Sequence, residues 1–600
     1  MPPKTAGAAL PAGAGRQPCD TVVQAFWHAV AAAPDRVAVR HGDRTLTYRA
    51  YGRCVAALAA RLERAGAAGG RVAVVLPSGP EAAVAVFAAL AARAQVALLN
   101  PGYPAPEMRP LLADADPAAV VTGGGAADVP AALAAERGVP VLPLGPDGLA
   151  LETWSGEASW DLADRAGPGP EDLATLMYTG GTTGVPKGVD HTHRSVMLTV
   201  RAMEACWPTR ADREVWLTVA PVFHIWGLLM GVLNPVYGRA TAVVFDRFRP
   251  GPVVEALVRH RASVFSGGPA ALYAGLLAEP ALASADLSDL RVCPGGGSPF
   301  PLELLDRWRA ATGVPIREAF GMTELAPITA QPPGAEPRPG TVGRPAPLVE
   351  VRVAADDGSA ALPPGTVGEI LVRGPHLFRG YRGRPEQTAA ALTDGWLRTG
   401  DLGRLDEDGY LRIVDRKKDM IIVSGFNVYP REIDEVLAAH PGIRQSVTIG
   451  VPDPRRGELP VSFVVPEPGR AAGTAELHAY LAGRLVGYKR PAAITPLERI
   501  PLTPANKADR RALRDLWAAR TDPSRTDRAK PARTGPSQPS RPEAAGATPP
   551  ARGQTHGAGP AFEGPPGHGA DRAARPAPGP GPGGPGRADR PGDAGGPAAG

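Results

Sequence analysis

The glycine-rich segment YTGGTTGVPKGV (178–189) follows a buried, strand-like run and carries the strongest chemical signal in the sequence. Glycine lets the backbone approach an anion closely, and successive backbone N–H groups can surround phosphate oxygens. A Walker loop needs GxxxxGK followed by Ser or Thr at the start of a helix, but here Lys187 lies between Pro186 and Gly188. The segment therefore predicts either a polyphosphate-binding loop of another kind or a tight structural turn.

This segment closely resembles the phosphate-binding loop of adenylate-forming enzymes, a superfamily of acyl-CoA synthetases, luciferases and adenylation domains of peptide synthetases. Gly180 stands where Ser is more common, as in many long-chain fatty-acid:CoA ligases. The other motifs of the family follow in the family's order, which makes the match specific over about residues 20–515. They are PVFHIWG (221–227), PGGGSP (294–299), AFGMTE (319–324), GEILVRGPHLFRGY (368–381), DGWLRTGDLG (394–403), DRKKDMIIVSGFNVYPREI (415–433) and PLTPANKADRRAL (501–513). Of these, PGGGSP resembles the loop that lines the adenine and acyl sites.

The resemblance implies an ATP site built from the loop and five later segments. Phe320 replaces the family's common Tyr and would stack on adenine, which needs only an aromatic ring. Asp401 would accept hydrogen bonds from the ribose, as acidic residues do in dinucleotide folds, and Arg416 would contact ribose or phosphate. A turn cap and a surface ion pair are the alternatives for these two residues. The other implied ATP or AMP contacts are Thr179, Gly180, Gly181, Thr182, Thr183, Gly184, Lys187, Gly296, Gly297, Gly321, Met322, Thr323 and Lys507.

Four residues are implied to act on the reacting groups. Glu324 and the Thr183 hydroxyl would hold magnesium, an ion that prefers hard oxygen ligands and reduces repulsion between ATP and a carboxylate; alternatively, Glu324 balances a helix start. Lys507 would touch the substrate carboxylate and the α-phosphate, where charge shifts in the transition state. Asn506 stands where the family has Gly, and Asn tolerates left-handed backbone angles. His224 would gate the acyl site or orient the carboxylate; alternatively, it is a core histidine.

The acyl pocket is implied to lie at PVFHIWG, lined by Phe223, His224 and Trp226. The apolar residues that follow favour a fatty or other hydrophobic carboxylate, although the same run would serve as ordinary core. Aryl and medium-chain acids stay open. Amino-acid-adenylating domains usually place an Asp here, so an amino acid is disfavoured.

Two histidines near the loop, His191 and His193, could suggest a metal site. The family has a Thr-His pair that matches Thr192 and His193 and has no metal role, so we expect none. The resemblance gives no role to Asp190 or His191.

The implied reaction has two halves. The carboxylate attacks the α-phosphate of MgATP to give acyl-adenylate and pyrophosphate, and a thiol then attacks the activated carbonyl and releases AMP. In the family the C-terminal domain swings between two poses about a hinge, which the DRKKD motif places at Lys418. The first pose presents Lys507, and the second presents a CoA face at Ser424, Gly425 and Phe426.

We therefore expect an AMP-forming acid–thiol ligase of fatty-acid and lipid metabolism. Its expected substrate is a small-molecule carboxylate that is hydrophobic and fatty, and it would also use ATP, Mg²⁺ and CoA. CoA is the expected acceptor because nothing after residue 520 resembles a carrier domain with a phosphopantetheine serine. Two alternatives stay open. One is a ligase that loads a separate carrier protein in trans, and the other is a non-catalytic nucleotide-binding scaffold.

The elements that must position these residues alternate along the chain. Buried strand-like runs such as 71–79 alternate with helical segments such as 81–93, which predicts parallel-rich sheets flanked by helices. Ligands then bind at the carboxyl ends of strands. After about residue 340 the pieces are shorter and β-rich. We expect an α/β fold with an AMP-binding N-terminal domain at 19–415, which includes a β-rich subdomain, and a small mobile α+β C-terminal domain at 416–519.

Composition separates this core from its ends. The 73 glycines and 69 prolines are nearly a quarter of the 600 residues, about twice the usual share. Glycine and proline are densest at 520–600, which holds no Leu, Ile, Val, Met, Trp or Tyr, although most of them lie in the rest of the chain. Such a segment cannot bury enough apolar surface to offset its chain entropy. We therefore expect a disordered Pro/Gly/Ala-rich tail at 520–600 and a disordered leader at 1–18.

Charge and cysteine usage exclude other classes. A net charge of +5 from 65 basic and 60 acidic residues implies no nucleic-acid-binding face. The four cysteines are scattered without a CxxC motif, which fits a reducing compartment. The N-terminus lacks the apolar region of a signal peptide, and the most apolar run, 82–99, contains Arg93 and Gln95. We expect a soluble cytoplasmic protein without a transmembrane segment.

Overall fold

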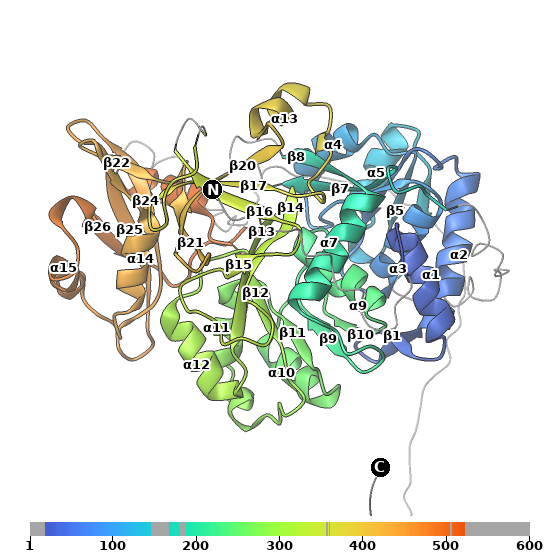
Figure 1. The fold of residues 1–600 in the computed structure, drawn as a ribbon, viewed down its shortest axis with the longest axis horizontal. Coiled ribbons are helices and arrows are strands. Elements are labelled where there is room, and N and C mark those ends of the chain that lie inside the picture. The colour runs from blue at the N-terminus through green and yellow to red at the C-terminus, as the bar shows by residue number, and fades with distance from the viewer. Residues whose placement is uncertain are drawn as a thin grey trace, which may run out of the picture. The chain divides into compact units, whose positions relative to one another are not determined.

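The computed structural model of the chain describes residues 18–145, 167–179, 186–355, 358, 360–503 and 507–521 (Figure 1). The glycine–threonine part of the loop (180–185) and Asn506 lie outside the described residues. So do the expected leader and tail, apart from residue 18 and residues 520 and 521.

The largest sheet has seven strands in the order β18-β8-β7-β4-β3-β5-β6. Its strands from β7 to β6 run parallel, whereas β8 and β18 are antiparallel additions at one edge. On β3, Val72 and Val74 pack into the core that contains α3, while Ala73 and Val75 pack against α4 and α5. Both faces are covered, which explains the continuous apolar runs in the sequence. The strands are β3 (Arg71–Val75), β4 (Gln95–Leu98), β5 (Ala119–Thr122), β6 (Val141–Pro143), β7 (Leu173–Thr179), β8 (Lys187–Thr192) and β18 (Gly380–Tyr381).

A second sheet has the order β11-β9-β10-β1-β2 and is parallel except for the β1–β2 pair. Helix α3 (Pro80–Ala91) packs against strands of both sheets and is apolar on all sides, as a helix buried between two sheets must be. Its Phe87 ring stacks on Phe26 of α1 at 4.4 Å. The strands are β1 (Val37–His41), β2 (Arg44–Thr47), β9 (Val215–Thr218), β10 (Thr241–Val244) and β11 (Val264–Ser266).

Helices surround these sheets (Figure 1). Among the described residues, none is long and apolar enough to cross a membrane. The helices of this part are α1 (Val22–Ala32), α2 (Tyr48–Arg64), α4 (Ala105–Ala115), α5 (Asp128–Glu136), α7 (His193–Cys206), α8 (Ile225–Leu228), a π-turn (Leu229–Leu233), α9 (Asn234–Tyr237), α10 (Pro250–Arg259), α11 (Ala270–Leu277), α12 (Leu302–Thr312) and α13 (Pro385–Ala391).

Two smaller sheets follow, of which the second, from Glu350 onward, is the β-rich part that the sequence predicts after residue 340. One begins with the parallel pair β12 and β13, to which β14 and β15 add in antiparallel fashion, and the other is antiparallel throughout. The strands are β12 (Cys293–Gly296), β13 (Ile316–Met322), β14 (Leu325–Ala330) and β15 (Arg344–Pro345), then β16 (Glu350–Ala354), β17 (Gly368–Arg373), β19 (Leu392–Thr393), β20 (Trp396–Leu405) and β21 (Leu411–Arg416).

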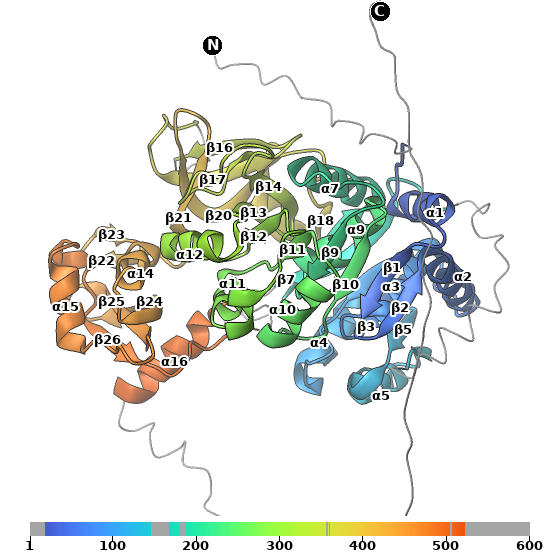
Figure 2. The same cartoon turned by 90° about the horizontal axis from the view of Figure 1, so that it is seen from below.

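The last sheet has the order β23-β22-β25-β24, with β26 parallel to β25. Helix α16 follows Lys507 and packs on β24, where its Leu513 is buried with Val447 (Figure 2). The architecture is the mixed α/β fold that the sequence predicts. These last elements are β22 (Ile421–Val423), β23 (Phe426–Val428), α14 (Pro430–Ala438), β24 (Ile443–Asp453), β25 (Gly457–Pro466), α15 (Thr474–Ala482), β26 (Ala493–Pro496) and α16 (Arg510–Thr521).

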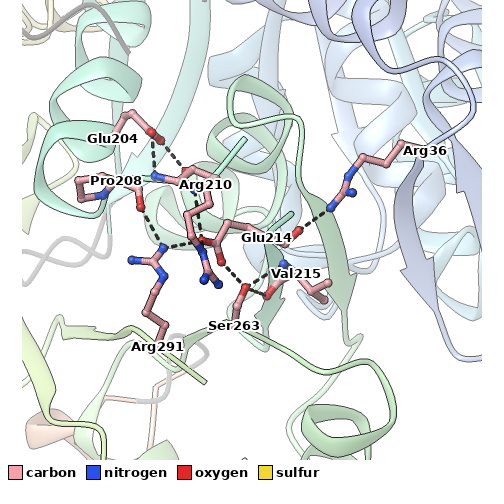
Figure 3. A network of polar contacts seen from close by, with 9 residues as sticks. Arg36, Glu204, Pro208, Arg210, Glu214, Val215, Ser263 and Arg291 are labelled. Carbon is pink, nitrogen blue, oxygen red and sulfur yellow. Dashed lines mark hydrogen bonds and ion pairs between the residues drawn. The ribbon is translucent and has the colours of Figure 1, made fainter. Parts of the chain in front are cut away.

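A buried carboxylate fastens the segment that leads into β9 (Figure 3). Glu214 is fully buried, and its Oε1 pairs with Arg210 Nε at 2.7 Å and with Arg291 at 2.7 Å. Its Oε2 accepts a hydrogen bond from Ser263. Its carbonyl oxygen accepts a bond of 3.0 Å from Arg36. Glu214 therefore ties β9 to the segments that precede β11 and β12.

Candidate active site

Lys507 lies against the glycine turn that ends β12. A β-carbon added to Gly297, whose φ is +80°, would lie 3.6 Å from Lys507 Cε and 3.9 Å from Nζ. A closed turn holds the lysine backbone: Thr503 N–H donates to the Lys507 carbonyl oxygen at 2.7 Å, and Lys507 N–H donates to Thr503 Oγ1 at 3.2 Å. The structure thus brings together two residues that the sequence assigned to the ATP site from distant motifs.

Three further charged groups influence Lys507. Asp401 and Arg416 are cross-strand partners on β20 and β21, with 3.5 Å between Oδ1 and Nε. Burial lowers the pKa of Lys507 to about 8, together with the positive charges of Arg416 and Lys418 and against the charge of Asp401. Burial also raises the pKa of Asp401 to about 6, although the nearby cations oppose this. Three cations and one carboxylate gather here, which suits a nucleotide phosphate.

His224 begins α8 and faces the same region. Its Nδ1 accepts a hydrogen bond from the Trp226 N–H at 3.2 Å, so the proton of the neutral ring lies on Nε2. Burial and the charge of Lys507 lower the pKa of His224 to about 3, and the imidazole is therefore neutral near pH 7. A neutral N–H donor beside an ammonium group can bind a carboxylate. Phe223 and Trp226, on either side, are partly buried against the main core.

Glu324 lies in the turn between β13 and β14, so it does not stand at a helix start. Its carboxylate is buried and accepts a hydrogen bond of 2.8 Å from the Tyr381 hydroxyl. Burial raises the pKa of Glu324, while Tyr381 and the charge of Lys187 oppose the rise. Lys187 Nζ also lies 4.8 Å from the centre of the Tyr381 ring. Tyr381 belongs to a motif of the sequence, but its contact with Glu324 joins residues far apart in the chain.

The donor set at Glu324 suits magnesium carried by a nucleotide. Groups of three or more His, Cys, Asp and Glu side chains that could hold a metal are absent from the described residues. Magnesium often binds one or two carboxylates and completes its octahedron with water and substrate phosphates. A single buried carboxylate near the expected phosphate loop fits that mode. Thr183, the other expected ligand, lies outside the described residues.

The remaining ATP-site residues cluster at strand ends. Thr179 is the last residue of β7 and pairs with Lys187, so the strands on both sides of the loop are in register. Phe320, Gly321 and Met322 end β13, and Thr323 follows in the turn. Gly296 ends β12, where the sequence predicts a loop, because its N–H bonds to the Gly268 carbonyl at 3.0 Å and extends the strand pairing. Gly180, Gly181, Thr182 and Gly184 lie outside the described residues.

His191 and Asp190, which received no role from the sequence, make specific contacts. His191 is buried, and its Nε2 lies 2.8 Å from the Thr323 carbonyl oxygen, to which it donates. Burial lowers the pKa of His191 to about 4, so the ring is neutral. Asp190 Oδ1 accepts a bond of 2.7 Å from Gln95 Nε2. Sequence alone gave no signal for these pairs, because each joins residues more than 90 positions apart in the chain.

The predicted hinge and CoA face lie in consecutive turns. Lys418 is inside a turn closed by bonds of 3.0 Å from Asp419 N–H and Met420 N–H to the Arg416 carbonyl. Ser424 and Gly425 take positive φ values of +51° and +84° to turn between β22 and β23. Phe426 is 54% exposed and stacks on Tyr488 at 4.6 Å. The exposed Phe426 ring, backed by the partly buried Tyr488, is available for a ligand.

The sequence also matches known protein families and relatives. The AMP-binding enzyme family model matches residues 26–382, and the model of the AMP-binding enzyme C-terminal domain matches 432–507. A feruloyl-CoA synthase from an Amycolatopsis species is 38% identical over 483 residues, which are 79% of this chain and 94% of that protein. A long-chain-fatty-acid–CoA ligase of Salmonella typhimurium is 32% identical over 539 residues, 84% of this chain and 95% of the relative.

Solved structures agree. ATP-bound MatB from Rhodopseudomonas palustris superimposes with a TM-score of 0.79 at 30% identity, over 84% of this chain and 100% of that chain. The chain belongs to the AMP-binding enzyme family of adenylate-forming acyl-CoA synthetases, as the sequence predicts. It is an ATP-dependent, AMP-forming acyl-CoA ligase.

Proposed function

We propose that this enzyme activates a hydrophobic carboxylate as its acyl-adenylate, releases pyrophosphate and then transfers the acyl group to the thiol of CoA. The observation that carries the proposal is the position of Lys507 against Gly297, within electrostatic range of His224 and of the Asp401–Arg416 pair. By its motif, Lys507 is the cation expected to contact the carboxylate and the α-phosphate. A ligand that carries both anions would raise the pKa of Lys507 and keep its side chain protonated.

In the first half-reaction each residue of the site has a separate role. The neutral Nε2–H of His224 orients the carboxylate, and the ammonium of Lys507 contacts both that carboxylate and the α-phosphate, where charge shifts as the new P–O bond forms. Asp401 and Arg416 hold the ribose, and Phe320 stacks on the adenine. A magnesium ion, held by Glu324 and Thr183, would supply positive charge to the phosphate oxygens.

In the second half-reaction the thiol must reach the activated carbonyl from which AMP leaves. We propose a domain boundary near Asp415, with residues 19–415 forming the large domain and 416–519 the mobile small domain. Rotation about Lys418 would withdraw Lys507 and bring Ser424, Gly425 and Phe426 to the site. Closure of this kind excludes water and assembles the second active site from the same cleft.

The acyl group is proposed to be hydrophobic, as in fatty-acid and lipid metabolism, because the region after His224 is apolar. The named relatives act on feruloyl and long-chain fatty acyl groups, so both classes belong in the test. We also propose a cytoplasmic location, supported by four cysteines that form no disulfide and all lie in the described residues.

The decisive experiment is ATP–pyrophosphate exchange over a panel of fatty, aryl and short-chain carboxylates. Exchange with a hydrophobic acid is the expected result, and exchange with none would favour the nucleotide-binding scaffold. CoA or a phosphopantetheinylated carrier protein is then added and the product is weighed. Formation of the acyl-CoA supports CoA as acceptor, while acylation of the carrier alone would favour a ligase that loads a carrier in trans.

A further inference from the structure

The indole of Trp226 lies across two glycines next to the reacting groups. A β-carbon added to Gly268 would lie 3.3 Å from Trp226 Nε1, and one added to Gly296 would lie 3.6 Å from Cζ3. Gly296 is followed directly by Gly297, against which Lys507 lies. The ring therefore rests on bare backbone at the ends of β11 and β12, one residue from the expected position of the carboxylate. A β-carbon at Gly268 would press against the indole, and one at Gly296 would be in ordinary van der Waals contact with it.

The indole is also supported from behind. The ring of Trp207, which is fully buried, meets it edge to face at 5.9 Å and 72°. Close-packed interiors deform little, so the fully buried Trp207 ring resists displacement of the indole toward it.

These contacts bear on the length of the acyl group. An acyl chain whose carboxylate is held by Lys507 and His224 extends past Gly297 and meets the indole of Trp226 after a short distance. A compact group can pack on the ring face. A long alkyl chain would have to displace a side chain that is held by two backbone contacts and a buried aromatic partner.

We propose that Trp226 is the specificity-determining residue that restricts this enzyme to compact hydrophobic carboxylates, with a single ring or a short chain, and excludes long alkyl chains. This inference rests on the proposed function, because it concerns the acyl end of the same site. It selects the compact members of the hydrophobic class, whereas the sequence favours a fatty or other hydrophobic carboxylate without setting its length.

The test compares kcat/KM for benzoate, cinnamate, butanoate, octanoate, dodecanoate and hexadecanoate in wild type, Trp226→Ala and Trp226→Phe. Wild type should prefer the best compact acid to dodecanoate by at least ~10-fold, the scale on which an apolar pocket discriminates size. Trp226→Ala should shift that ratio toward dodecanoate by ~10-fold or more. Trp226→Phe is the matched control, because it keeps a ring in place and should keep the wild-type order.

Thermal unfolding and the KM for ATP report whether each variant is folded, and Trp226→Leu replaces the alanine variant if that one is not. Wild-type activity on hexadecanoate equal to that on compact acids would overturn the inference, as would an unchanged ratio in a folded Trp226→Ala or Trp226→Leu. Both results leave the ligase activity standing. Absence of exchange with every acid would instead overturn the proposed function, and this inference with it.

Discussion

The Nε2 of His191 lies 2.8 Å from the carbonyl oxygen of Thr323. This bond joins the strand that leaves the glycine–threonine loop to the turn that carries Glu324. Tyr381, on the neighbouring strand β18, bonds to the Glu324 carboxylate itself. The turn is therefore held at its backbone by β8 and at its side chain by β18, and both strands belong to the sheet that presents the phosphate loop.

Replacing His191 by Leu should weaken adenylation, because the Thr323 carbonyl loses a buried donor and the turn gains freedom. We expect kcat/KM for ATP in the exchange reaction to fall about 10-fold, the usual effect of losing a group that orients a ligand. His191→Gln, which keeps an N–H donor, should recover part of the loss. His193→Gln is a neighbouring control, because both ring nitrogens of His193 are buried without a hydrogen-bond partner among the described residues. Wild-type kinetics for His191→Leu would contradict this role.

The pKa of Lys507, lowered to about 8, predicts an alkaline limit for adenylation. A lysine is charged below its pKa, so the catalytic ammonium is present at pH 7 and is lost as the pH rises through 8. We expect kcat/KM for the exchange reaction to fall above about pH 8 with the slope of a single proton. Lys507→Arg should have a lower maximum but no alkaline limb near pH 8, because a guanidinium stays protonated. An alkaline limb that survives in the arginine variant would assign the titration to another group.

Lys418→Pro tests the hinge. Proline fixes φ, so it should trap the pose in which Lys507 reaches Gly297. ATP–pyrophosphate exchange should stay near wild type, whereas thioester formation in single-turnover assays should fall strongly. Lys418→Ala is the control for loss of the side chain, since it leaves the backbone free to rotate. Equal loss of both half-reactions in the proline variant would contradict the assignment of the hinge.

Glu214→Gln should lower the free energy of unfolding by about 2 kcal/mol, as expected when charge-assisted bonds to a buried group are lost. Burial alone would raise the pKa of Glu214, but hydrogen bonds from Arg210 and Ser263 and the charge of Arg291 bring it below 4.5. The ionised form is therefore favoured in the folded state. The stabilisation by ionised Glu214 is fully present above 4.5, the pKa of the unfolded state. It is lost as the pH falls through the pKa of Glu214 in the folded state, which is lower.

Urea unfolding at pH 7 measures this effect. Glu350→Gln is the matched control, because the Glu350–Arg373 pair joins side chains that are 52% and 45% exposed, and exposed pairs contribute less than about 1 kcal/mol. Equal losses in the two variants would show that the buried position of Glu214 is unimportant.

Much of the fold could be read from local patterns. The apolar runs at 71–79 and 173–179 became β3 and β7 of the parallel sheet, and the helical pattern at 81–93 became the buried α3. The PGGGSP motif was expected as a loop, yet Gly296 belongs to β12 because a neighbouring backbone completes its pairing. Local sequence could not show that partner, since Gly268 comes from the end of another strand.

By itself, the sequence determined the α/β class through its periodicity, and the family through the resemblance of its ordered motifs to those of a known family. Only the tertiary structure decided how the groups act on one another. Burial in the folded chain, and to a lesser extent the charge of the distant Lys507, keep His224 neutral. The position of the Trp226 indole depends on its packing against Gly268 and Gly296. The pKa shifts and the side-chain packing arise between segments that only folding brings into contact, so no local sequence pattern could predict them.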